Sequence, residues 1–272
     1  MDQSEFDRDN TKNCCIESEI NKNVQEEACW LGIDEAGRGP VLGPMVYGTC
    51  FSPVSMKEKF TEMGFADSKT LTEEQREEIF SKICEAGDIM GWMIEILSPA
   101  YISNSMLSRQ KYNLNSISHD CAIRLIKRAI EKGVKVTEVY VDTVGDPEKY
   151  QAKLKGIFPD IDITVAKKAD ALFPIVSAAS ICAKVGRDRA IKNWKFQEGI
   201  EMEEGEYGSG YPGDPKTKKF MSEEMDKVFG FPQFVRFGWS TAALILQKNA
   251  VAVKWLVILF TIFVSIKLPM GF

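Results

Sequence analysis

Short apolar runs alternate with polar turns and amphipathic segments along most of the chain. Five runs have the length and the apolar or alternating character of β-strands, and they cover residues 28–33, 45–51, 91–97, 136–141 and 161–166. The first three favour antiparallel pairing, whereas the last two alternate with helical segments and favour parallel addition. The pattern therefore predicts an α/β fold in which helices pack against one mixed sheet.

Helix-start signals and helical periodicity predict the helices of this fold. Thr72 and Gln75 match a capping box, so a helix is expected to begin there and to end near Ala86. Asp146 followed by Pro147 has the character of an N-cap and a first helical residue. Apolar spacing and small residues predict further helices around residues 117–130, 173–194 and 216–228, so the C-terminal part is expected to be helical.

The first 27 residues differ in composition from the rest. They hold eight acidic and three basic residues and are rich in Asn, Glu and Lys, which predicts a disordered acidic tail. The remaining residues hold 31 acidic and 31 basic side chains, so the net charge of -5 belongs to this tail. The body of the protein can therefore carry a local basic surface for nucleic acid. We expect no signal peptide, because a basic segment followed by an apolar one is absent from the N-terminus.

The last residues are unusually apolar. Residues 255–266 form an uncharged run of 12 residues, which is shorter than the ~20 needed to cross a bilayer. In order of preference, the run is an alternative or wrongly assigned C-terminus, a buried or partner-facing segment, or a short membrane anchor. We expect no membrane attachment, and we expect truncation after residue 249 to reduce aggregation. The predicted divisions are residues 1–27, residues 28–248 as the main domain, and residues 249–272.

Two carboxylates stand at the end of the first predicted strand. Asp34 and Glu35 follow an apolar run, and burying them costs free energy unless a cation or a metal ion is present. Gly37, Arg38 and Gly39 come next, where the glycines allow close backbone approach to a ligand and the arginine can face an anion. An ordinary turn with solvated acids is the alternative. The density of glycine favours a site for metal and phosphate.

Two further acids follow predicted strands. Asp142 ends the fourth strand and Asp170 precedes the long helix, and ligands of open α/β sheets bind beyond the carboxyl ends of strands. Four carboxylates without His or Cys favour Mg²⁺ or Mn²⁺. They suffice for two ions about 4 Å apart, which suits in-line displacement at phosphorus. A strand-end turn for Asp142 and a helix N-cap for Asp170 are the alternatives.

Other residue types narrow the chemistry. Seven cysteines without a Cys-x-x-Cys pair argue against structural zinc and suggest a reducing compartment. The single histidine, His119, gives little support to Ser-His or Cys-His catalysis. Residues 167–195 carry seven basic and two acidic side chains, which suits either a phosphate backbone or a solvated helix face.

Six motifs stand in one order over about residues 28–248. They are Gly32-Ile-Asp34-Glu35-Ala-Gly37-Arg38-Gly39-Pro40, Asp67-Ser68-Lys69, Val141-Asp142, the segment from Ala169-Asp170 to Lys184, Gly208-Ser-Gly-Tyr211-Pro212-Gly-Asp214-Pro, and Phe231-Pro-Gln-Phe-Val-Arg236-Phe-Gly-Trp239. Together they closely resemble the type 2 ribonuclease H family. The last motif and the length resemble the eukaryotic catalytic (A) subunits of that family.

The resemblance implies a ribonuclease H-like fold and a metal-dependent endonuclease. Such an enzyme cuts RNA paired with DNA, and cuts 5′ of single ribonucleotides embedded in duplex DNA, leaving 3′-hydroxyl and 5′-phosphate ends. By resemblance, Asp34, Glu35, Asp142 and Asp170 are the catalytic acids that bind two Mg²⁺ or Mn²⁺ ions. The family's eukaryotic form also implies two accessory subunits, B and C, and location in the nucleus.

The resemblance also implies how substrate is bound. The glycine–arginine–glycine segment reads the ribose 2′-hydroxyl with backbone groups, a tyrosine packs against the sugar at the RNA–DNA junction, and two lysines contact phosphates. A site built to bond a hydroxyl rejects a substrate that lacks it. For the tyrosine, a turn residue covering a helix end is the alternative. The substrate-binding residues implied are Gly37, Arg38, Gly39, Lys69, Lys184 and Tyr211.

Two other classes of function compete with a nuclease. A non-catalytic scaffold that kept the fold would be expected to lack at least one acid, and here all four are present. A nucleotide-binding enzyme would need Gly-x-x-x-x-Gly-Lys-[Ser/Thr] or Gly-x-Gly-x-x-Gly, and the glycine loop matches neither pattern.

Overall fold

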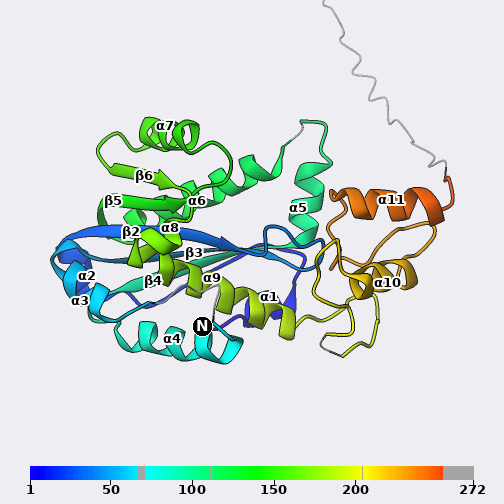
Figure 1. The fold of residues 1–272 in the computed structure, drawn as a ribbon, viewed down its shortest axis with the longest axis horizontal. Coiled ribbons are helices and arrows are strands. Elements are labelled where there is room, and N and C mark those ends of the chain that lie inside the picture. The colour runs from blue at the N-terminus through cyan, green and yellow to red at the C-terminus, as the bar shows by residue number, and fades with distance from the viewer. Residues whose placement is uncertain (66–70, 111, 204, 254–272) are drawn as a thin grey trace, which may run out of the picture.

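A mixed six-stranded sheet forms the centre of the molecule (Figure 1). The computed structural model describes residues 1–65, 71–110, 112–203 and 205–253. The strands are β1 (Cys14–Glu17), β2 (Ala28–Ala36), β3 (Met45–Pro53), β4 (Gly91–Leu97), β5 (Lys135–Asp142) and β6 (Asp162–Ala166). They lie in the order β1-β4-β3-β2-β5-β6. The pairs among β1, β4, β3 and β2 are antiparallel, whereas β2–β5 and β5–β6 are parallel.

This architecture confirms the predicted α/β fold. The five predicted strands correspond to β2 to β6, and each has the predicted antiparallel or parallel orientation. The central strand β2 pairs with β3 along its whole length and with β5 on its other side. Its apolar residues are buried because both of its edges and both of its faces are covered. The end of β2 therefore lies in the middle of the molecule.

Helices cover both faces of the sheet. They are α1 (Ser4–Arg8), α2 (Lys22–Glu26), α3 (Lys57–Glu62), α4 (Glu73–Glu85), α5 (Pro99–Met106), α6 (Leu114–Glu131), α7 (Pro147–Ile157), α8 (Ala169–Leu172), α9 (Pro174–Lys192), α10 (Pro215–Glu223) and α11 (Ser240–Asn249), with a 3-10 turn over Val54–Met56. The predicted capping box of Thr72 and Gln75 is present, and Asp146 caps α7. The helix predicted over residues 216–228 is too long, because the chain leaves it and forms a turn at Asp226.

The long helix α9 lies unusually close to the sheet. Its small residues pack over two glycines, Gly32 in β2 and Gly48 in β3. A Cβ atom at Gly32 would lie 2.4 Å from the Ile175 carbonyl oxygen, and one at Gly48 would lie 2.3 Å from that of Ala179. No side chain fits in that space. The close packing fixes the height of α9 above the end of β2, where its polar residues meet the acids of the sheet.

The predicted disorder of residues 1–27 is wrong. This segment forms α1, β1 and α2, and β1 adds an edge strand beside β4. Phe6 and Val24 are buried against the two faces of the sheet, at 1% and 0% exposure. The Gln3 side chain donates a hydrogen bond of 2.9 Å to the Gly186 carbonyl in α9. A few buried contacts thus order a segment whose average composition is polar.

The C-terminal part has an aromatic core of its own. Phe220 in α10, Phe234 and Leu42 belong to one cluster, which joins this part to the loop between β2 and β3. In Figure 1, α10 and α11 lie beside the end of the sheet at which β2 and β3 meet that loop. The predicted helical C-terminal part is present as these two helices.

The predicted hydrophobic tail lies outside the described residues from residue 254 onward, so its role stays a prediction. Within the part of the chain that is described, no helix combines the length and the apolar character needed to cross a membrane.

Candidate active site

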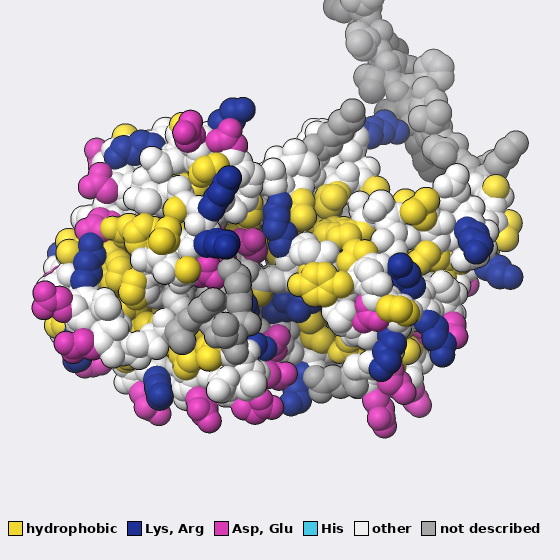
Figure 2. Space-filling view, viewed as in Figure 1, with side chains coloured by type: hydrophobic (Ala, Val, Ile, Leu, Met, Phe, Trp, Pro, Cys, Tyr) yellow, Lys and Arg dark blue, Asp and Glu magenta, His cyan; other side chains and the backbone are white. Residues whose placement is uncertain are grey.

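Three of the four predicted acids line one cleft. Asp34 and Glu35 lie near the end of β2, and Asp142 is the last residue of the neighbouring parallel strand β5. Ile33 pairs with Val141 in the sheet, so the next residues of the two strands, Asp34 and Asp142, lie side by side. The cleft has a volume of about 390 Å³. Figure 2 shows acidic side chains within a hollow near the middle of the molecule, with basic side chains around it.

Asp34 is the most deeply buried of these three acids, with 5% of its surface exposed. Burial is the main cause that raises the pKa of its carboxyl group to about 7; a hydrogen bond from Ser180 opposes the rise, and the nearby Asp142 carboxylate contributes to it. The backbone N–H of Glu35 donates to Asp34 Oδ1 at 2.7 Å. Lys184 Nζ donates to Ser180 Oγ at 3.0 Å, which brings a positive charge from α9 close to the pair of acids.

The fourth acid, Asp170, lies in α8, which begins close to the end of β5. The backbone N–H of Ala169 donates to Asp142 Oδ1 at 2.8 Å, so the start of α8 is fastened to the end of β5. Asp170 follows Ala169 and is buried, but it does not line the cleft. The predicted alternative of a helix N-cap is wrong for Asp170, because Lys168, in a left-handed conformation with φ of 56°, occupies that position.

The donor set fits a hard divalent cation. The cleft wall offers carboxylate oxygens and no His or Cys, which matches the preference of Mg²⁺ and Mn²⁺. The repulsion between Asp34 and Asp142 in a buried setting is what a cation would offset. Among the described residues, however, no three His, Cys, Asp or Glu side chains already stand close enough to hold an ion. The predicted convergence of all four acids is therefore only partly met.

The glycine loop closes one side of the cleft. Gly37 lines the cleft and has a φ of +78°, a conformation that glycine adopts without strain. A Cβ atom at Gly37 would lie 2.1 Å from Nε of Arg187, so only glycine admits the arginine side chain here. A Cβ atom at Gly39 would lie 3.2 Å from the ring of Tyr211. The structure therefore brings together the glycine loop and the tyrosine that sequence motifs had associated.

Tyr211 is packed on one side of its ring and exposed on the other. Its ring packs over Gly39, while 54% of its surface remains exposed and it lines the cleft. The alternative prediction of a tyrosine that only covers a helix end does not account for this position.

The remaining predicted substrate residues are placed as follows. Lys184 lines the cleft. The Arg38 guanidinium donates to Ser118 and Asn115 of α6, so its side chain is directed at this helix, and Arg38 is not among the cleft residues. The expectation that the Arg38 side chain faces an anion in the cleft is therefore not met. Lys69 lies outside the described residues.

Buried contacts that the sequence analysis missed hold the glycine loop in place. Arg236 is fully buried, and it donates to the carbonyls of Gly43 at 2.7 Å and Arg38 at 3.3 Å. Its guanidinium lies over the ring of Trp239, whose Nε1 donates to the Gly39 carbonyl at 3.1 Å. Both residues belong to the 231–239 motif, which was noted only for its resemblance. A buried arginine among aromatic residues was the signal that could have revealed them.

Two cleft arginines were also missed. Arg76 at the start of α4 forms an ion pair of 2.7 Å with Asp188, and Arg187 lies next to it. Arg187 was counted only as one of many bases in residues 167–195. Which of those bases faces the cleft depends on the rotation of α9, which periodicity alone does not fix.

Comparisons with known proteins show which proteins the chain is similar to. A family model described as Ribonuclease HII matches residues 31–242. The chain is 58% identical to the A subunit of ribonuclease H2 from Rattus norvegicus over 94% of this chain and 85% of the relative, and 56% identical to that of Homo sapiens over the same shares. Its structure is similar to the crystal structure of the ribonuclease H2 from Pyrococcus horikoshii OT3, with a TM-score of 0.67 and 35% identity over 81% of this chain and 98% of that one.

Proposed function

The chain belongs to the ribonuclease HII family of endoribonucleases, and from this premise we propose that it is the catalytic subunit of a ribonuclease H2. We propose that it hydrolyses the RNA strand of RNA–DNA hybrids and cuts 5′ of single ribonucleotides embedded in duplex DNA. Hydrolysis of the P–O3′ bond by water leaves a 3′-hydroxyl on one fragment and a 5′-phosphate on the other. One observation carries the proposal: the paired acids Asp34 and Asp142 lie in the same cleft as Gly37 and Tyr211.

The acids provide for two divalent ions in this proposal. Asp34, Glu35, Asp142 and Asp170 would hold Mg²⁺ or Mn²⁺, and such ions supply an activated water and neutralise charge at the reacting phosphate. The chain's own groups do the positioning. The hydrogen bonds from Glu35 N–H to Asp34 and from Ala169 N–H to Asp142 fix one oxygen of each carboxylate. Lys184 adds a positive charge on the α9 side of the cleft.

The glycine loop and Tyr211 provide selectivity for a ribonucleotide. A 2′-hydroxyl is the only group that separates the correct nucleotide from its DNA neighbours. Backbone groups at Gly37 to Gly39 can approach it closely, because neither glycine carries a side chain of its own. The Tyr211 ring beside Gly39 offers an apolar face to the sugar and a hydroxyl to the 2′ position. A deoxyribose leaves these polar groups without their partner, which penalises the wrong substrate.

A cleavage assay tests the function. A labelled DNA duplex with one ribonucleotide, an RNA–DNA hybrid and an all-DNA duplex are incubated with the full chain, alone and with two co-expressed accessory subunits, in Mg²⁺ or in EDTA. Cutting 5′ of the ribonucleotide and in the hybrid is expected in Mg²⁺ only, with the DNA duplex left intact. Binding of the first substrate without cutting in any condition would favour a nucleic-acid scaffold and overturn the proposal.

We propose further that the chain works in the nucleus with accessory subunits B and C. The relatives carry the name of one lettered member of a complex, the A subunit, which supports an assembly of several chains. Nuclear DNA is where embedded ribonucleotides would be met during replication and removed by excision repair. Affinity purification of the tagged chain from nuclear and cytoplasmic fractions tests this point. Recovery of the chain without partners from the cytoplasm alone would contradict it.

A further inference from the structure

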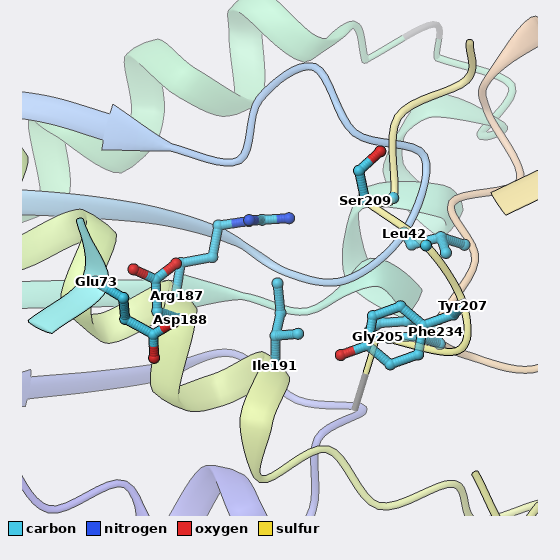
Figure 3. Close-up of a pocket in the computed structure, with 11 residues that line it drawn as sticks. Leu42, Glu73, Arg187, Asp188, Ile191, Gly205, Tyr207, Ser209 and Phe234 are labelled. Carbon is cyan, nitrogen blue, oxygen red and sulfur yellow. The ribbon is translucent and has the colours of Figure 1, made fainter. Parts of the chain in front are cut away.

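A second pocket adjoins the cleft of the acids. This pocket has a volume of about 230 Å³, lies between α9 and the loop of residues 205–210, and shares Arg187 and Asp188 with the first cleft. In Figure 3 the Arg187 side chain extends away from α9, and the rings of Tyr207 and Phe234 lie across the pocket from Asp188. Arg187 therefore stands at the boundary between the two spaces.

Arg187 differs from the arginines near it. Arg76 is paired with Asp188 at 2.7 Å, and Arg189 is paired with Glu77 at 2.6 Å. Arg187 donates from Nε to the Pro44 carbonyl at 3.2 Å. Across the described ranges, neither of its terminal nitrogens makes a hydrogen bond or ion pair with the protein. Burial lowers the pKa of its guanidinium, and the charge of the neighbouring Asp188 only partly opposes this shift.

The glycine loop leaves room for this arginine. Gly37 has no Cβ where Nε and Cδ of Arg187 pass, at 2.1 Å and 2.4 Å from the ideal Cβ position. The arginine thus crosses directly beside the loop that faces the reacting nucleotide. Arg187 is held by Nε and lines both spaces, and a guanidinium held in this way can bind the two oxygens of a phosphate through its terminal nitrogens.

We propose that Arg187 binds a phosphate of the ribonucleotide-containing strand next to the scissile phosphate, where the strand passes from the cleft of the acids into the second pocket. The inference rests on the proposed function, because it takes its ligand from that substrate. Asp188 does not oppose the phosphate, since its charge is offset by Arg76. Glu73 is the other acid of the second pocket, and the strand is expected to keep to the Arg187 side of it.

A scan of uncharged phosphates tests the assignment. A set of duplexes with one ribonucleotide is prepared, and each duplex carries one methylphosphonate. Across the set, the methylphosphonate replaces in turn each phosphate within three positions of the scissile bond. Binding to the full chain is measured in EDTA by fluorescence anisotropy. Arg187→Gln is expected to weaken binding of the unmodified duplex on the order of tenfold. It should lower the slope of log affinity against log salt by about one. At one flanking position, a methylphosphonate should weaken binding by the wild type but should not weaken binding by Arg187→Gln any further. At the other positions, it should weaken binding by both proteins.

Two variants separate phosphate binding from a purely structural role. Arg187→Lys keeps the charge, so it should keep the salt slope of the wild type and its sensitivity at that same position. Arg189→Gln is the matched control, because it removes the same charge from the same helix at a site paired with Glu77, and it should keep the full wild-type profile. Thermal unfolding of each variant confirms folding.

The results distinguish two failures. If Arg187→Gln and Arg187→Lys lose affinity equally and stay sensitive at every position, Arg187 only supports the loop and the inference is wrong. That result is independent of cleavage, because binding is measured without metal. If the wild type does not cut the unmodified duplex in Mg²⁺, the proposed function fails instead, whatever the phosphate scan shows.

Discussion

At the scale of single residues, the neighbouring carboxylates Asp34 and Asp142 are the groups of the cleft on which the proposed metal site depends. Replacing either with alanine removes ligands from the proposed metal site, whereas the basic groups that bind phosphates remain. We expect Asp34→Ala or Asp142→Ala to lower single-turnover cleavage on the order of 10²–10³-fold or more. Substrate binding should stay within a few-fold of wild type. Asp146→Ala, which removes an exposed helix-capping acid, is the control and should cut normally. Substantial turnover by either cleft variant would remove the two-metal assignment.

Tyr211 carries a prediction about selectivity. Tyr211→Phe keeps the ring over Gly39 and removes only the hydroxyl, so the sugar should still stack. We expect the preference in binding for a duplex with a single ribonucleotide over an all-DNA duplex to fall roughly three- to tenfold, which is the worth of one neutral hydrogen bond. The ratio of the two dissociation constants, measured in EDTA, reports this change. An unchanged ratio would mean that the tyrosine acts only through its position in the turn.

Gly37 carries a prediction about backbone geometry. Gly37→Ala places a methyl group against Arg187 at a φ of +78°, where the left-handed conformation costs about 1–2 kcal/mol. We expect cleavage to fall more than about tenfold because the loop beside the acids must shift. Gly213→Ala is the matched control, since nothing lies within 4 Å of its Cβ position. Equal activities of the two variants would show that the Gly37 loop adapts without loss.

Sequence patterns could predict the acids of the site but not its arginines. Asp34, Glu35 and Asp142 stand at the ends of apolar strands. Because β5 is preceded and followed by helices along the chain, its parallel pairing with β2 could be predicted. Arg187 and Arg236 acquire their roles from tertiary contacts with the glycine loop. Those contacts join segments about 150 and 200 residues apart, and local periodicity carries no information about them.

At the scale of elements, the apolar strands β2 to β6 were predictable and the short edge strand β1 was not. Buried strands such as β3 read as continuous apolar runs. β1 has only four residues, Cys14–Glu17, within a polar segment, and its pairing with β4 depends on contacts about 80 residues away. The composition of residues 1–27 therefore predicted disorder for a segment that completes the sheet.

The N-terminal segment should contribute measurably to stability. Phe6 is 1% exposed and lies edge-on to Trp194 at a centroid distance of 6.1 Å. Phe6→Ala is expected to lower the free energy of unfolding by about 3–5 kcal/mol, because it leaves a cavity between α1 and the end of α9. Urea denaturation followed by tryptophan fluorescence measures the change. Leu107→Ala, at a site with 63% exposure, is the control and should change stability by less than about 0.5 kcal/mol. If Phe6→Ala lowers the free energy of unfolding by no more than the control does, residues 1–27 do not contribute to stability through Phe6.

At the scale of the whole molecule, charge is distributed so that a neutral body can bind an anionic substrate. The net charge of -5 comes from residues 1–27, while Arg76, Lys184 and Arg187 gather at the cleft. Substrate attraction is therefore a local property of the cleft, and the overall charge of the chain does not report it.

Long-range contacts join the C-terminal part to the loop beside the acids, and a buried arginine makes two of them. Arg236 is buried without a carboxylate partner among the described residues, and it ties the 231–239 segment to the loop between β2 and β3. Burying an unpaired guanidinium is costly, so an apolar residue of similar length should be tolerated by the core. The carbonyls of Gly43 and Arg38 would lose their donor, however, and the loop would lose its fixed position beside the acids.

We therefore expect Arg236→Met to lower cleavage by more than about tenfold while the free energy of unfolding falls by less than about 2 kcal/mol. Single-turnover cleavage and urea denaturation of the same preparations measure the two effects. Gln233→Ala, an exposed position of the same segment, is the control and should leave both unchanged. If stability falls steeply and the cleavage rate of the folded fraction stays normal, Arg236 serves the core alone. A selective loss of activity would instead show that the C-terminal part sets the geometry of the glycine loop, because Arg236 does not line the cleft and donates to carbonyls of that loop.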